Sequence, residues 1–128
     1  LVSTSGDYLR FAQMLLNKGE LDGARLLSRK TVELMTSDHL PPALRPMKIG
    51  GSVIHGYGSG LGVAVLTDLG EYSALGSVGS YQWRGAANTS FWIDPAEDLI
   101  GILMAQYMPD GTFPAADDFS VLAYQALQ

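Results

Sequence analysis

The run Trp83-Arg84-Gly85-Ala86-Ala87 is the part of the sequence whose residue types point most directly to chemistry. It lies between two apolar stretches that predict β-strands. Glycine and alanine at the end of a strand leave the backbone bare, so a ligand can come within hydrogen-bonding distance of main-chain N–H groups. The segment therefore predicts a strand edge that binds a ligand through its backbone.

A nucleophile with its base is not found in the sequence. No serine is followed three residues later by lysine, and no serine lies in Gly-x-Ser-x-Gly. A serine needs such a base within reach to lose its hydroxyl proton. Tyr57-Gly58-Ser59 has the form Tyr-x-Ser, but it opens a glycine-rich strand, and we expect a structural role. The chain alone is therefore not expected to perform acyl transfer.

Metal and cofactor chemistry is not indicated. The sequence has no cysteine and no His-Glu-x-x-His, so we predict no metal site and no cofactor. Asp38 and His39 could form an acid/base pair, but adjacent loop residues rarely face each other. We expect exposed or packing roles for His39 and His55.

Composition excludes several partners. The net charge is −5, and the eight basic residues are scattered, so neither nucleic acid nor anionic lipid is expected to bind. The longest apolar run, residues 99–105, is too short to span a bilayer. The first residues lack the features of a signal peptide, and the start looks like the middle of a protein. Cytoplasmic and periplasmic locations both remain open.

Periodicity predicts an α+β fold, with an antiparallel sheet flanked by helices. Thr4 and Asp7 have the spacing of a capping box, and a second helix should begin after Ser28. A long surface loop, either a lid or a passive connector, is expected over residues 38–56 because prolines and glycines interrupt both periodicities. The elements expected are helices at 7–17 and 29–36, strands at 60–67, 73–85, 89–94 and 99–106, and a final helix.

The final helix is expected to be capped near Thr112, with Pro114 in its first turn. Its apolar residues recur at helical spacing and predict a buried stripe, formed by Phe119, Leu122, Ala123 and Ala126.

Four segments taken in order resemble the serine β-lactamase-like hydrolases, the class C β-lactamases and family VIII carboxylesterases. Trp83-Arg84-Gly85 resembles the Trp-x-Gly form of their third active-site motif. The other segments are Leu1-Val2-Ser3-Thr4-Ser5-Gly6-Asp7-Tyr8-Leu9-Arg10-Phe11, Gly19-Glu20-Leu21-Asp22-Gly23 with Leu27-Ser28, and Tyr57-Gly58-Ser59-Gly60-Leu61-Gly62-Val63. The resemblance implies that residues 1–128 form the C-terminal segment of a β-lactamase/transpeptidase-like domain, whose N-terminal part with the nucleophile is absent.

The resemblance also implies roles for the motif residues. Ala86 would donate its backbone N–H to the oxyanion hole. Trp83, with Gly85 and Ala87, would line the substrate pocket, although Trp83 could instead be an ordinary core aromatic. Arg84 departs from the family pattern of Gly, Ser or Thr, and it either points away from the cleft or engages a substrate carboxylate.

A carboxylesterase acting through an acyl-enzyme is the function that the resemblance favours. The tryptophan replaces the lysine that helps β-lactamases bind the substrate carboxylate, so we expect a small-molecule ester rather than a β-lactam. A β-lactamase, D-amino-acid peptidase or acyltransferase of the same fold is the alternative, and a non-catalytic ligand- or partner-binding module is another. The expected partner of the chain is the missing N-terminal part of its own fold.

Overall fold

A computed structural model describes residues 2–49, 51–109 and 111–128. Leu1, the first residue of the predicted helix-start motif, and Gly50, in the predicted loop, lie outside these ranges. The elements in chain order are α1 (Ser5–Leu16), β1 (Glu20–Leu21), β2 (Ala24–Arg25), α2 (Arg29–Met35), a 3-10 turn (Pro42–Leu44), β3 (Met47–Ile49), β4 (Ser52–Ile54), β5 (Tyr57–Ser59), β6 (Ala64–Leu66), α3 (Leu69–Tyr72), β7 (Tyr81–Arg84), β8 (Ser90–Asp94), β9 (Leu99–Leu103) and α4 (Ala115–Gln125).

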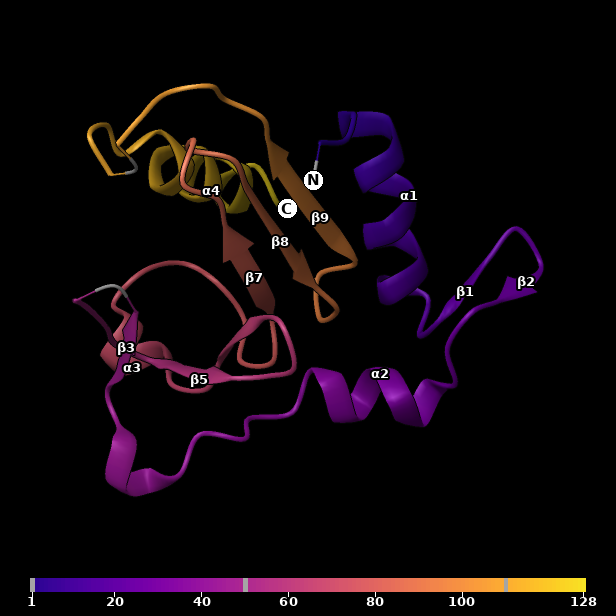
Figure 1. The fold of residues 1–128 in the computed structure, drawn as a ribbon, viewed down its shortest axis with the longest axis horizontal. Coiled ribbons are helices and arrows are strands. Elements are labelled where there is room, and N and C mark those ends of the chain that lie inside the picture. Colours follow the sequence, from indigo (N-terminus) through magenta and orange to yellow (C-terminus); the bar gives the residue numbers. More distant parts are fainter. Residues whose placement is uncertain (1, 50, 110) are drawn as a thin grey trace.

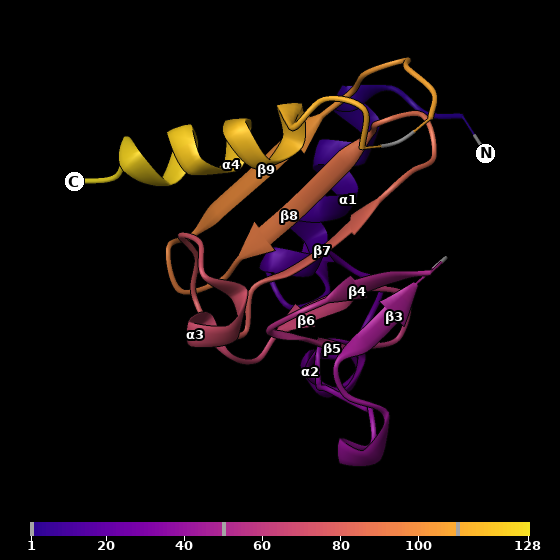
Figure 2. The ribbon, with the colours of Figure 1, turned by 90° about the vertical axis from the view of Figure 1, so that its left-hand side faces the viewer.

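A five-stranded antiparallel sheet in the order β5-β6-β7-β8-β9 organises the molecule. The sequence predicts an antiparallel sheet with four of these strands, and β5 is the additional one. Helix α1 lies on one face of its β7–β9 part, and α4 lies on the other face (Figures 1 and 2). Two further hairpins, β1-β2 and β3-β4, form separate two-stranded sheets. The fold is therefore α+β, with an antiparallel sheet between helices.

The main core lies between α1 and the sheet. Ala12 and Leu15 of α1 are buried against alternate residues of the strands, including Tyr81 and Ile93. Because side chains alternate across a strand, these residues all point to the α1 face. A smaller core around Met47, Tyr57, Ala64 and Leu66 lies at the β5–β6 end of the sheet.

Local signals set the helix ends as predicted. The Thr4 hydroxyl accepts a hydrogen bond from the Asp7 N–H (3.1 Å), and the Ser28 hydroxyl accepts one from the Thr31 N–H (3.0 Å). At the end of α1 the chain turns left-handed at Lys18 and Gly19, whose N–H groups donate to the carbonyls of Leu15 and Met14. This pair of bonds is the Schellman arrangement that ends a helix.

The prediction of a continuous loop over residues 38–56 is wrong. The segment contains the 3-10 turn and the β3-β4 hairpin, in which Met47 pairs with Ile54. Met47 and Ile54 pack into the smaller core, so long-range apolar contacts give this segment regular structure despite its prolines and glycines.

Two predicted strands are shorter than expected. The stretch 60–67 is a strand only at β6, because Gly60–Val63 forms a turn in which Gly60 N–H donates to the Val63 carbonyl (2.8 Å). Leu61, in this turn, is half-exposed. The stretch 73–85 is a strand only at β7, since residues 73–80 form bends, a turn at 78–79 and irregular backbone.

The predicted start and buried stripe of the last helix are also wrong. Pro114 is the N-cap residue of α4, whereas the Thr112 hydroxyl donates to the Pro109 carbonyl (2.9 Å) instead of capping the helix. Phe119, Leu122 and Ala126 are exposed, and only Ala123 is half-buried. The face that helix α4 turns to the sheet includes Tyr124, which bonds Asp94, and the edge of Phe119, which contacts Trp92, but not Leu122.

Candidate functional site

An open groove of about 780 Å³ lies where β7 ends beside the start of α1. All five residues of the predicted site, Trp83 to Ala87, line it. The rest of the described lining comes from the N-terminal segment and α1, from β8, and from the chain after β9: Val2, Ser3, Ser5, Tyr8, Thr89, Ser90, Phe91, Met104, Ala105 and Gln106. The fold thus gathers the motif at one concave surface.

Strand β7 has an uncovered edge at its second half. β6 pairs only with Tyr81 and Gln82, whereas β8 pairs with all four residues of β7. Within the described residues, Trp83 therefore has β8, but not β6, as its strand neighbour. A strand edge of this kind can bind an extended ligand through main-chain hydrogen bonds.

Trp83 is not a core aromatic. Its exposed fraction is 42%, whereas that of Trp92, on the neighbouring strand, is 7%. Trp83 pairs in register with Phe91, whose ring lies 5.0 Å from the ring of Tyr8 on α1. The three aromatic residues give the groove an apolar wall on the α1 face of the sheet.

A tight turn follows the strand and carries Ala86 and Ala87. Gly85 N–H donates to the Thr89 carbonyl (2.8 Å), and Asn88 N–H donates to the Gly85 carbonyl (3.1 Å). A Cβ at Gly85 would collide with the Thr89 hydroxyl, which accounts for glycine at this position. Within the described residues, the N–H groups of Ala86 and Ala87 have no acceptor. They are two adjacent donors at the rim of the groove.

Arg84 directs its guanidinium away from the face that carries Trp83. Alternation along β7 places neighbouring side chains on opposite faces of the sheet. The guanidinium forms an ion pair with Asp117 of α4. Of the two alternatives for Arg84, the geometry therefore favours orientation away from the aromatic wall.

Sequence reasoning missed the contribution of the N-terminal segment to the groove. The sequence places Ser3, Ser5 and Tyr8 only in the motif at the start of the first helix, yet all three line the groove. Burial raises the pKa of Tyr8 above its ordinary value, so at neutral pH its hydroxyl is a hydrogen-bond donor rather than a base. The described lining includes no lysine, histidine or carboxylate.

The other candidates from the sequence lie elsewhere and have structural contacts. Asp38 forms an ion pair with Arg45 and accepts hydrogen bonds from the N–H groups of Leu40 and Ser59. His39 Nε2 donates to the Leu34 carbonyl (2.8 Å) and does not face Asp38 in an acid/base pair. No group of three potential metal ligands occurs in the described part of the chain.

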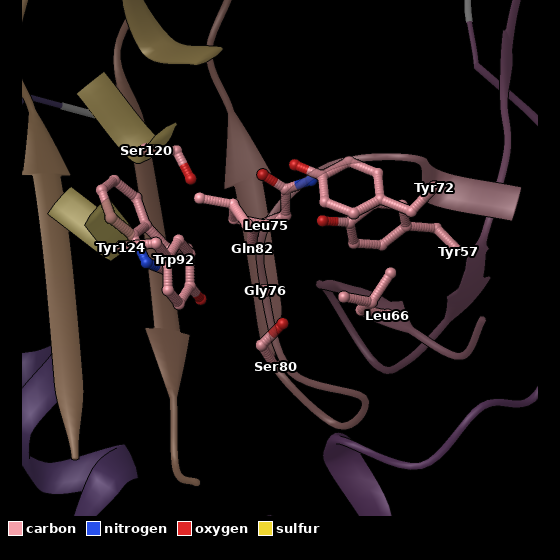
Figure 3. A pocket seen from close by; sticks show the side chains of 10 residues that line it. All are labelled: Tyr57, Leu66, Tyr72, Leu75, Gly76, Ser80, Gln82, Trp92, Ser120 and Tyr124. Atoms are coloured by element: carbon pink, nitrogen blue, oxygen red, sulfur yellow. The ribbon is translucent and has the colours of Figure 1, made fainter. Parts of the chain in front are cut away.

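A second, partly open cavity on the α4 face holds only about 10 Å³, about enough for one water molecule. Trp92 and Tyr124 point into it from one side and Tyr57 and Tyr72 from the other (Figure 3). The rings of Tyr57 and Tyr72 are in edge contact (5.1 Å), and burial, with Tyr72 nearby, raises the pKa of Tyr57. This cavity is too small for a substrate, and Tyr57-Gly58-Ser59 serves as strand β5 beside it.

The arrangement of helices around the antiparallel sheet is the β-lactamase/transpeptidase-like fold. The family model described as Beta-lactamase matches residues 1–126, and the chain therefore belongs to the β-lactamase family. Two relatives from Mycobacterium tuberculosis, Protein Rv1367c of strain H37Rv and Uncharacterized protein MT1414 of strain CDC 1551, are each 40% identical over 120 residues. That alignment covers 91% of this chain and 30% of each relative.

Solved structures share the fold. EstCE1, described as a hydrolase with promiscuous acyltransferase activity, superposes with a TM-score of 0.71 at 20% identity, over 97% of this chain and 29% of that one. Simvastatin synthase (LovD) from Aspergillus terreus, in a mutant form, superposes with a TM-score of 0.75 at 24% identity, over 97% and 32%. The chain thus spans about a third of the length of these proteins. No helix in the described ranges combines the length and apolarity needed to cross a bilayer.

Proposed function

We propose that this chain contributes the oxyanion donor and one pocket wall to the active site of a serine hydrolase that works through an acyl-enzyme. The observation that carries the proposal is the pair of N–H groups at Ala86 and Ala87, which have no acceptor among the described residues and lie in the groove just beyond the end of β7. Donors held in place before the reaction stabilise a developing oxyanion without reorganising, typically by a few kcal/mol.

The nucleophile and its base come from residues outside these 128 in this proposal. Serine acylation requires a base, and the described groove lining supplies only hydroxyls, an amide, an arginine and apolar groups. Residues 1–128 would be the C-terminal segment of the domain, with the remaining part of the same fold opposite the groove. The exposed apolar side chains near the groove, Val2, Trp83 and Met104, support a covering partner there.

A carboxylesterase is the activity that the groove supports best. Tyr8, Trp83 and Phe91 form an apolar wall suited to the acyl or alcohol group of an ester. The guanidinium of Arg84, the cation in the described lining, is paired with Asp117, which weakens recognition of the carboxylate found on β-lactams. An acyltransferase is the second candidate, supported by the acyltransferase activity in the description of EstCE1.

The test uses a short-chain p-nitrophenyl ester and the full-length protein. Trp83→Ala should lower kcat/KM roughly tenfold or more, since an indole wall contributes at least ~1.4 kcal/mol to binding the apolar group. Leu26→Ala, which removes an exposed apolar side chain outside the described groove lining, is the matched control and should leave kcat/KM unchanged. Unchanged kinetics for Trp83→Ala would remove this residue from the site.

Two further measurements separate the alternatives. Faster turnover of a cephalosporin reporter than of the ester would replace the esterase with a β-lactamase, and faster acyl transfer to an added alcohol than to water would favour the acyltransferase. A fluorophosphonate probe should label one serine of the full-length protein. Absence of both labelling and turnover would support the non-catalytic module.

A further inference from the structure

Asn88 connects the turn that carries the two free N–H groups to a distant segment of the chain. Its side-chain amide donates to the carbonyls of Tyr107 (2.7 Å) and Pro109 (3.3 Å), and its side-chain oxygen accepts from the Gly111 N–H (3.4 Å). A main-chain bond from Tyr107 N–H to the Ala87 carbonyl (3.1 Å) runs beside them. One side chain thus uses both its donor and its acceptor on residues 107–111.

These bonds restrain the Ala86–Ala87 peptide from the side opposite β7. Asn88 has a φ of +62°, in the left-handed region, and it closes the turn through its own N–H to the Gly85 carbonyl. Tyr107 is itself held by the contact between its ring and that of Phe113 (5.1 Å). The turn therefore has a strand on one side and a braced loop on the other.

A left-handed turn residue needs only to tolerate positive φ, and glycine or aspartate would do so. Neither can donate through a side-chain amide. The three side-chain bonds therefore point to a requirement beyond backbone conformation.

We propose that Asn88 is a positioning residue that holds the N–H groups of Ala86 and Ala87 in the direction of the substrate carbonyl. The proposal rests on the function proposed above. Without the Asn88 amide, the Tyr107–Ala87 main-chain bond is the hydrogen bond that still connects the turn to Tyr107, Pro109 and Gly111 among the described residues, and the two donors lose their alignment. Misplacement of a catalytic group by about 1 Å can lower the rate about 100-fold.

The test compares Asn88→Gly and Asn88→Asp with the wild type in the full-length protein. Both variants tolerate positive φ and lack the amide donors. We expect kcat for the p-nitrophenyl ester to fall about 10- to 100-fold while KM changes less than about threefold, because alignment acts on the transition state. Asn17→Asp is the matched control, since Asn17 lies at the exposed end of α1, and its kcat should be unchanged. Full activity in Asn88→Gly would overturn the proposal.

Amide hydrogen exchange keeps this test separate from that of the proposed function. Both Asn88 variants should speed exchange of the Tyr107 N–H at least tenfold relative to the wild type and to Asn17→Asp, whether or not the wild type hydrolyses esters. If the wild type is inactive and exchange accelerates, the proposed function fails while the restraint by Asn88 stands. Unchanged exchange would overturn the positioning role by itself.

Discussion

At the scale of single residues, the two tryptophans show how position on a strand decides role. Trp92 lies on the α4 face, where its ring contacts Phe119 at 5.1 Å and lies over Gly101. Trp83 lies on the other face, near the start of α1, where the helix no longer covers the sheet. A tryptophan is therefore a buried core residue in β8, as Trp92, and lines the groove in β7, as Trp83.

Gly101 provides the first prediction at this scale. It pairs in register with Trp92, and a Cβ there would collide with the indole ring. Gly101→Ala should lower the free energy of unfolding by about 1–3 kcal/mol, because overpacking forces the ring or the strand to move. Urea unfolding measures this change. Gly6→Ala, in a spacious helical position, should be neutral or stabilising, and an equal loss in both variants would contradict the account.

At the scale of elements, polar contacts as well as apolar packing join α4 to the sheet. The Tyr124 hydroxyl donates to Asp94 at 2.7 Å, and Asp117 pairs with Arg84. Asp94 is fully buried at the end of β8, where it also accepts a hydrogen bond from the Ala96 N–H (3.0 Å). The carboxylate thus orders the β8–β9 turn and anchors α4 at the same time.

Removing the Tyr124 hydroxyl should weaken the attachment of α4. In Tyr124→Phe the buried Asp94 carboxylate loses its side-chain partner, which typically lowers the free energy of unfolding by about 1–3 kcal/mol. Chemical unfolding followed by circular dichroism gives the value. Tyr107→Phe is the control, because Tyr107 is exposed and should change stability by less than about 0.5 kcal/mol. A similar effect in both variants would show that Asp94 does not need Tyr124.

At the scale of the whole molecule, buried tyrosines link stability to alkaline pH. Burial raises the pKa of Tyr81 to about 12 and raises the pKa values of Tyr57 and Tyr124 as well. For Tyr124 the hydrogen bond to Asp94 adds to the effect of burial. The folded state therefore favours the neutral phenols more strongly than the unfolded state does.

The sign of the pH dependence follows from these shifts. Below the unfolded value, near pH 10, the three phenols are neutral in both states, so they contribute their full stability. Between pH 10 and the raised folded values, they ionise only on unfolding, and stability falls by up to ~1.4 kcal/mol per pH unit for each tyrosine. Urea midpoints from pH 8 to 11 should show this fall beginning near pH 10. Ionisation of Tyr81 near pH 10 in the folded protein, followed for that residue by NMR, would contradict it.

Predictions from the sequence succeeded where the signal is local. The caps at Thr4 and Ser28 and the turn after Asp94 depend on side chains within a few residues of the backbone they bond. They failed where contacts between distant segments determine the structure. The β3-β4 hairpin forms because Met47 packs into the smaller core. Helix α4 turns Tyr124 rather than Leu122 toward the sheet. The spacing of apolar residues in the sequence shows that a helix is amphipathic, but it does not show which residues will face the sheet. In α4 the hydrogen bond from Tyr124 to the buried Asp94 carboxylate decides this.

For the site, the ordered motifs were enough to place Trp83 to Ala87 at a strand end and to assign the chain to its family, because bare residues after a strand are a local pattern. The concave shape was beyond such reasoning. It arises first because β6 stops short of Trp83. In addition, α1 brings Tyr8 beside Phe91. Finally, the hydrogen bond from Asn88 to the Tyr107 carbonyl holds the chain after β9 against the turn. Each of these contacts joins segments far apart in the chain, so only the folded arrangement turns a strand-edge motif into a groove.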